Sequence, residues 1–258
     1  LVLEFRKSLH NQDFVYLEGQ PVSFGQTVPY LPFIEIFKKY FRIEESDRVF
    51  TIRKKITDSV MNLDKALSGV IPFLCDLLSV AADDPAFKHL SPEEKRKLTF
   101  ESIKTLFLRE SQVRPVMIVM DNLHWVDKAS QELLNYIVEG IASARIMILG
   151  VYRPGYVQRW ADKSYYHHIP VNPLTLEESA SLAQILLNIE EITADLRRLV
   201  IDRAEGNPLY VEEIIRWLLE TGGIERSKAG GFIKEMPGEL AVPETIQDVI
   251  MARIDRLE

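Results

Sequence analysis

The chain has 258 residues, of which 47% are hydrophobic and 27% charged, the balance of an ordinary globular protein with a sizeable core. That length fits one domain with an appendage or two small domains. Lys and Arg total 31 against 38 Asp and Glu, and the resulting net charge of -7 excludes a general attraction to nucleic acid or anionic lipid. Cys75 is the only cysteine, so no intrachain disulfide or cysteine-based zinc site can form, which favours a reducing, cytoplasmic setting.

The N-terminal part of the sequence predicts helices around one short strand. Residues 1–9 carry an apolar residue on each turn of a helix. The run FVYL at 14–17 predicts a strand, and the Gly- and Pro-rich stretch after it predicts a loop. Residues 34–78 have a helical pattern with a break near Pro72. Ser91 is expected to cap the next helix, because a glutamate stands three residues after it.

Two buried strands are predicted next, and each is closed by a charged residue. Residues 116–120 (VMIVM) run into Asp121, and residues 146–152 (IMILGVY) run into Arg153. Continuous apolar runs are typical of strands buried on both faces of a parallel sheet. A helix between them completes a strand-helix-strand unit. Open α/β sheets bind ligands where parallel strands end, so we expect Asp121 and Arg153 to lie side by side at such an edge.

The rest of the chain is predicted to be helical, apart from a short edge strand near residues 168–171. Thr175 and Glu178 have the spacing of a capping box at the start of a helix. The run GNP at 206–208 separates two helical patterns. Residues 227–242 contain Gly and Pro and read as a connection, and a last helix is expected after it.

Four runs of the sequence carry a family resemblance: DNLHWVDKAS, YRP, GNPLYVEEI and VPETIQDVIMARIDRLE. Together they resemble the STAND-class signal-transduction ATPases, which are relatives of the AAA+ proteins. The likeness is strongest to modules of multidomain regulators found beside class III adenylate cyclase domains, the soluble adenylate cyclase-like kind. It covers nearly the whole chain. The resemblance implies a P-loop-type α/β core at residues 1–173, a helical lid at 174–226, and a linker with the start of a winged-helix-like unit at 227–258.

The resemblance also implies roles for individual residues. Asp121 is similar to the Walker B acid, which holds Mg²⁺ on the triphosphate. Arg153 is similar to the sensor arginine that reads the γ-phosphate. Gly206, Asn207 and Pro208 resemble the lid segment that packs near adenine. ATP and Mg²⁺ are therefore the implied cofactors, bound between core and lid, and effector or sensor domains of the same polypeptide are the implied partners.

Two departures from the family pattern limit the expected chemistry. The phosphate-binding loop GxxxxGK[ST] is absent; in relatives it precedes the position of Leu1, so the core is expected to lack its first strand and the chain as given to bind ATP barely. Asn122 stands where many relatives carry the acid that orients the attacking water, and an amide cannot accept a proton. We therefore expect an ATP-binding switch with slow hydrolysis at most. A nucleotide-free interaction scaffold and a competent ATPase stay open as alternatives.

Other polar and aromatic side chains are expected to have structural roles. Trp125 is expected in the core and Asp127 at the N-cap of the following helix. His124 is assigned to packing or hydrogen bonding ahead of proton transfer. The basic residues at 53–55 and 197–198 are expected to be solvated helix faces and not a nucleic-acid surface.

Overall fold

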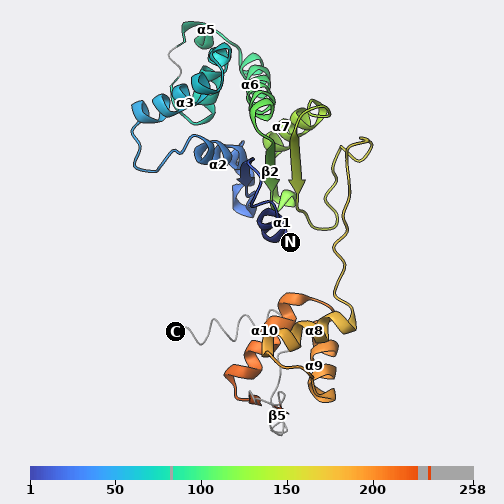
Figure 1. The fold of residues 1–258 in the computed structure, drawn as a ribbon. Coiled ribbons are helices and arrows are strands. Elements are labelled where there is room, and N and C mark those ends of the chain that lie inside the picture. The colour runs from blue at the N-terminus through green and yellow to red at the C-terminus, as the bar shows by residue number, and fades with distance from the viewer. Residues whose placement is uncertain (82–83, 226–231, 234–258) are drawn as a thin grey trace. The chain divides into compact units, whose positions relative to one another are not determined.

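The computed structural model describes residues 1–81, 84–225 and 232–233. The chain divides into two compact units, Leu1–His167 and His168–Glu258 (Figure 1). Each has its own hydrophobic core. The helix expected near the C-terminus, and most of the connection before it, lie outside the described residues. No helix within the described ranges is both long and apolar enough to cross a lipid bilayer.

The first unit is built on a parallel sheet in the order β1-β2-β3. Its strands are β1 (Val15–Gly19), β2 (Val116–Met120) and β3 (Ile146–Gly150). All five residues of the central strand β2 are buried, as its continuous apolar run predicts. No described strand pairs with the outer edge of β3, and its Met147 is 49% exposed. The predicted α/β fold, an open parallel sheet with surrounding helices, is confirmed.

Some described helices of this unit pack on the sheet, and others stand off from it (Figure 1). They are α1 (Val2–Ser8), η1 (Ser23–Thr27), α2 (Leu31–Tyr40), α3 (Val49–Leu63), η2 (Lys65–Val70), α4 (Ile71–Leu77), α5 (Pro85–Lys88), α6 (Pro92–Val113), η3 (Leu123–Trp125) and α7 (Lys128–Glu139). The capping box predicted at Ser91 is present and begins α6, which packs against β2 and β3. Phe37 of α2 stacks on Phe107 of α6 with ring centroids 5.5 Å apart, so these two helices share one core.

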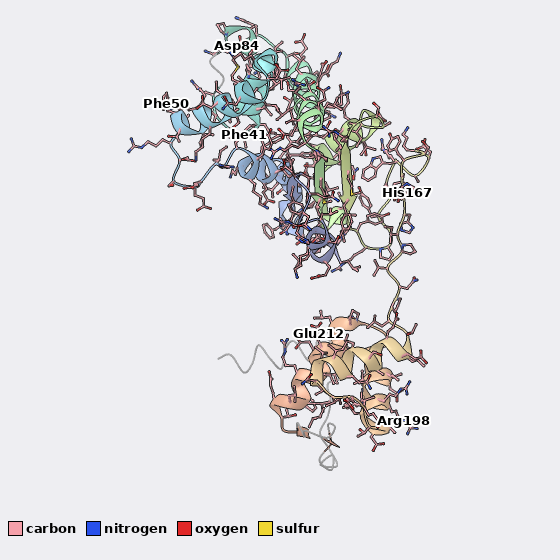
Figure 2. All side chains as sticks on the ribbon, in the orientation of Figure 1. Phe41, Phe50, Asp84, His167, Arg198 and Glu212 are labelled. Atoms are coloured by element: carbon pink, nitrogen blue, oxygen red, sulfur yellow. The ribbon has the colours of Figure 1, made fainter. Side chains whose placement is uncertain are left out.

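The helical pattern expected over residues 34–78 breaks near Pro72, as predicted, because α4 begins there after η2. It is also interrupted between α2 and α3, which was not predicted. Arg42 has a φ of 54°, a left-handed conformation that ends α2. Lys55 Nζ on α3 then holds the turn, because it donates to the carbonyl oxygen of Arg42 at 2.7 Å and to Asp47 Oδ2 at 2.5 Å. Phe41, at the end of α2, is buried in the core, whereas Phe50, in the first turn of α3, is 77% exposed; both are labelled in Figure 2.

The second unit is a small bundle of helices followed by a short hairpin. It contains α8 (Leu176–Leu187), α9 (Ala194–Ala204), α10 (Pro208–Glu220), β4 (Ile224–Glu225) and β5 (Phe232–Ile233), the two strands being antiparallel. The capping box at Thr175 and Glu178 is present, as predicted. The prediction of an edge strand near residues 168–171 is wrong, because these residues have no regular structure and no described strand pairs with them.

Candidate functional site

The ends of β2 and β3 lie side by side, so Asp121 and Arg153 follow neighbouring strands at one edge of the sheet. Met120 and Gly150 are the last partners in the register of these strands. The backbone stays joined beyond them: the N–H of Val151 donates to the Met120 carbonyl at 2.9 Å, and the N–H of Leu123 donates to the Val151 carbonyl at 2.9 Å. The turn after β2 is therefore tied to the chain that leads to Arg153.

Asp121 is half-buried, and its carboxylate makes no hydrogen bond or ion pair with any residue that the structure describes. Its N–H donates to the Gly19 carbonyl at 3.2 Å, which holds the residue against the end of β1. Within the described ranges, no three His, Cys, Asp or Glu side chains gather to hold a metal by themselves. Mg²⁺ bound with a nucleotide takes most of its ligands from water and phosphate, so one free carboxylate fits such an ion.

Asn122 adopts a left-handed conformation, with φ 62° and ψ 41°, at the residue before η3. Asparagine enters this region more readily than most residues, so the turn itself suits an asparagine. The side chain is still an amide, and it cannot act as a general base. The left-handed backbone thus explains why an asparagine stands at position 122, but the position still lacks a general base.

Trp125 is not in the core, and the expectation that it would be is wrong. The indole is half-exposed at the end of η3, the single turn that carries the chain away from the strand tip. The guanidinium carbon of Arg153 lies 5.6 Å from the Trp125 ring centroid, a cation-π geometry. Arg153 is exposed, and its guanidinium has no acidic partner among the described residues.

His124 packs on the Trp125 ring, with ring centroids 4.6 Å apart. Both ring nitrogens of His124 are buried without a hydrogen-bond partner in the described part of the chain. The predicted packing role is therefore observed. Asp127 is the N-cap of α7, as expected: its Oδ1 accepts the N–H of Ser130 at 2.9 Å.

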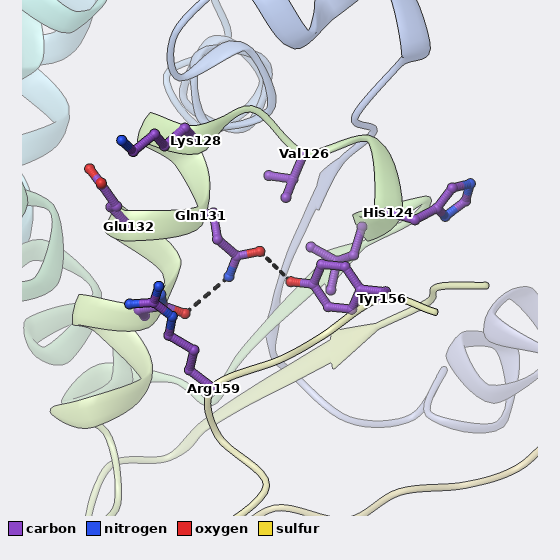
Figure 3. Close-up of a pocket in the computed structure, with 9 residues that line it drawn as sticks. His124, Val126, Lys128, Gln131, Glu132, Tyr156 and Arg159 are labelled. Carbon is purple, nitrogen blue, oxygen red and sulfur yellow. Dashed lines mark hydrogen bonds between the residues drawn. The ribbon is translucent and has the colours of Figure 1, made fainter. Parts of the chain in front are cut away.

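A pocket of about 320 Å³ opens beside η3, against α7 and the segment that follows β3 (Figure 3). Its walls are formed by Leu123, His124, Val126, Lys128, Gln131, Glu132, Asn135, Tyr156 and Arg159. Hydrogen bonds link the side chains of one wall. Tyr156 donates its hydroxyl to Gln131 Oε1, while Gln131 Nε2 and Trp160 Nε1 donate to Asn135 Oδ1 at 3.0 and 2.7 Å. Sequence reasoning missed this pocket, because its residues are scattered polar positions without a motif.

Neither Asp121 nor Arg153 lines that pocket. In Figure 3 the His124 ring also points away from α7. The pocket is therefore a neighbour of the strand tips and not the place where the predicted site residues meet.

The remaining predicted site residues, Gly206, Asn207 and Pro208, form the turn before α10 in the second unit. The Gly206 carbonyl accepts the N–H of Leu174 at 2.8 Å, and Gly206 has a φ of 76°. Asn207 caps α10 by accepting the N–H of Leu209 at 3.0 Å, and Pro208 occupies the first position of the helix. These are local structural roles, and contact with adenine stays a prediction.

Comparison with known proteins identifies the family. The family model described as AAA ATPase domain matches residues 1–149, more than half of the chain, and the chain belongs to this family. Membership agrees with the P-loop-type sheet described above and indicates nucleotide binding. A second family model, described as a domain of unknown function, matches residues 175–229, which cover the helices of the second unit.

One curated relative shows how small a part of a larger protein such a segment can be. The Uncharacterized protein R02095 of Rhizobium meliloti (strain 1021) is 26% identical to this chain over 106 residues. The matched segment is 40% of this chain and 10% of that protein. The chain thus spans a small fraction of the length of the relative that it matches.

Proposed function

We propose that this chain is the ATP-binding part of a regulatory switch in a multidomain signalling protein, with slow hydrolysis at most. The observation that carries the proposal is a pair of unpaired opposite charges on adjoining strand ends. The Asp121 carboxylate and the Arg153 guanidinium follow strands that pair up to Met120 and Gly150, and neither has an ionic partner among the described residues. Membership of the AAA ATPase domain family supports a nucleotide as their common ligand.

The chemistry of the two groups suits the two ends of a metal-bound triphosphate. Asp121 would supply a carboxylate oxygen to Mg²⁺, which screens the phosphate charge when it is bound. Arg153 would donate its planar pair of N–H groups to phosphate oxygens, an arrangement that favours bidentate contacts. Because ATP and ADP differ by one phosphoryl group, an arginine at this position can make the protein respond to which of them is bound.

A switch needs binding that differs between two conformations more than it needs turnover. A ligand that prefers one state by about 5.5 kcal/mol moves an equilibrium from 1:99 to 99:1. Asn122 stands next to Asp121 and cannot take a proton from an attacking water, so a bound ATP would persist. Slow hydrolysis is therefore part of the proposal.

Titration of the full-length protein with MgATP tests the assignment. Asp121→Ala should weaken the affinity at least about tenfold, since a direct metal ligand is lost. Asp162→Ala is the matched control, because this acid is on the same unit and its side chain is 75% exposed beside Lys163. The control should bind as wild type does, and equal affinity in Asp121→Ala would remove Asp121 from the site.

The two alternatives give different results in the same protein. A nucleotide-free scaffold would show no ATP affinity in the wild type. A competent ATPase would already release phosphate quickly, and Asn122→Asp would not raise that rate. The proposal predicts measurable binding, slow release of phosphate, and faster release in Asn122→Asp, because an acid can then orient the water.

A further inference from the structure

Arg153 and Trp125 are in contact beside the strand ends, and the proposed function gives this contact no role. The guanidinium carbon lies 5.6 Å from the centre of the indole, inside the roughly 6 Å limit for cation-π attraction. Arg153 is otherwise exposed, and no acidic side chain in the described part of the chain fixes its head group. The indole is thus the group that the structure shows holding this guanidinium.

The indole is itself held in place by the turn that carries it. The N–H of Trp125 donates to the Asn122 carbonyl at 2.9 Å, and Leu123, in the middle of the turn, is fully buried. Leu123 is also bonded to Val151, two residues before Arg153. Because the turn is anchored to the chain that leads to the arginine, the ring and the guanidinium are kept in reach of each other.

We infer that Trp125 is a positioning residue, which holds the Arg153 guanidinium at the carboxyl edge of the sheet. A ring that attracts the cation through its face leaves the in-plane N–H groups free, and these are the groups that grip phosphate oxygens. An arginine restrained before binding loses less rotamer freedom on binding than a free one. The inference rests on the proposed phosphate-sensing role of Arg153.

Trp125 suits this role better than a role in stability. It is half-exposed and does not belong to the buried core of the first unit, so its removal leaves that core intact. Thermal unfolding of Trp125→Leu should therefore stay close to that of wild type.

The first test measures the contact without nucleotide. In protein labelled with ¹⁵N at arginine, the Arg153 side-chain signal, assigned by its loss in Arg153→Lys, should carry an upfield ring-current shift. Trp125→Leu should return it to the position of a free arginine, whereas Trp125→Phe should keep part of the shift. An Arg153 signal that is unshifted in wild type overturns the inference, whatever the nucleotide data show.

The second test measures the ratio of ATP to ADP affinity in the full-length protein. Trp125→Leu should lower this ratio about threefold, the size expected for losing an exposed cation-π contact. Trp125→Phe should restore most of it. Adding Trp125→Leu to Arg153→Ala should cause no further loss, because the tryptophan acts only through the arginine.

The outcomes separate this inference from the proposed function. If Arg153→Ala lowers the ATP to ADP ratio and Trp125→Leu does not, the positioning role is wrong and the sensor role stands. If the ring-current shift is present but Arg153→Ala leaves the ratio unchanged, the proposed sensor role is wrong, and the positioning role falls with it. If Arg153→Ala and Trp125→Leu each lower the ATP to ADP affinity ratio, and the double variant lowers it no further than Arg153→Ala does, the sensor role and the positioning role are both supported.

Discussion

The backbone N–H of Tyr30 donates a hydrogen bond to Oδ1 of Asp127 at 3.3 Å, and the same oxygen caps α7 by accepting the N–H of Ser130. Asp127 is only 5% exposed; its bond with Ser130 is buried and its bond with Tyr30 is part-buried. Tyr30 precedes α2, on the loop that follows β1. One carboxylate oxygen therefore joins the start of α7, which follows the turn after β2, to the loop after β1.

Replacing Asp127 tests this link. Asp127→Ala removes the acceptor of two N–H groups and should lower the free energy of unfolding by about 2–3 kcal/mol. Ser91→Ala, which removes the cap of α6 without a long-range bond, should cost only about 1 kcal/mol. Asp127→Asn keeps the accepting oxygen and should recover most of the loss. Urea unfolding of the three variants gives the comparison, and equal losses in the two alanine variants would refute the link.

Gly150 has room for no side chain where β3 meets η3. A Cβ there would lie 2.5 Å from Cδ1 of Leu123, which is fully buried. Gly150→Ala should therefore cost about 1–3 kcal/mol by overpacking, and should weaken MgATP binding by displacing the turn after Asp121. Gly69→Ala is the control, because nothing lies within 4 Å of a Cβ at that position. Wild-type stability in Gly150→Ala would show that the turn adapts.

Gly206 combines a left-handed backbone with crowding in the second unit. Its φ is 76°, and an added Cβ would lie 2.5 Å from the Leu174 carbonyl oxygen. Gly222 has a similar φ of 72°, and nothing lies within 4 Å of a Cβ added there. Gly222→Ala therefore measures the cost of the left-handed backbone without crowding. Gly222→Ala should cost about 1 kcal/mol and Gly206→Ala clearly more, as measured by chemical denaturation. The reverse order would mean that the turn before α10 is loosely packed.

Tyr152 makes stability depend on pH in the alkaline range. Burial, and then the hydrogen bond with the Tyr166 hydroxyl at 2.9 Å, raises the pKa of Tyr152 to about 12. An unfolded chain loses this proton near pH 10, so between about pH 10 and 12 unfolding releases a proton and stability falls as pH rises. Below pH 10 the contribution is fully present.

The Tyr152→Phe variant lacks this titration. Urea midpoints measured at pH 9, 10 and 11 should therefore fall less steeply for the variant than for the wild type. Parallel curves would show that the Tyr152 hydroxyl keeps its ordinary pKa in the folded protein.

The strands and the helix caps were predictable because their signals are local. The apolar run at 116–120 has the length and composition of an interior strand, and the Ser91 and Thr175 caps bond to groups three residues away. The adjacency of the β2 and β3 tips followed from the crossover rule for parallel strands. All of these depend on neighbours in sequence or on a general rule of topology.

The features that were missed depend on distant partners. The turn at residues 41–48 contains neither Gly nor Pro, and it is held by Lys55 from the next helix. Trp125 reads as a core residue by its type, yet the turn that carries it leaves the ring half-exposed beside Arg153. The hydrogen bond from Tyr30 to Asp127 spans 97 positions, and no local sequence pattern predicts it.

The Mg²⁺ dependence of ATP affinity tests the central claim most directly, because it asks whether the Asp121 carboxylate holds the metal. Full-length wild type and the near-isosteric Asp121→Asn should be titrated with ATP at increasing Mg²⁺ concentrations. We predict that added Mg²⁺ raises the affinity of the wild type and has little effect on that of the variant. The same rise in both proteins would contradict the account.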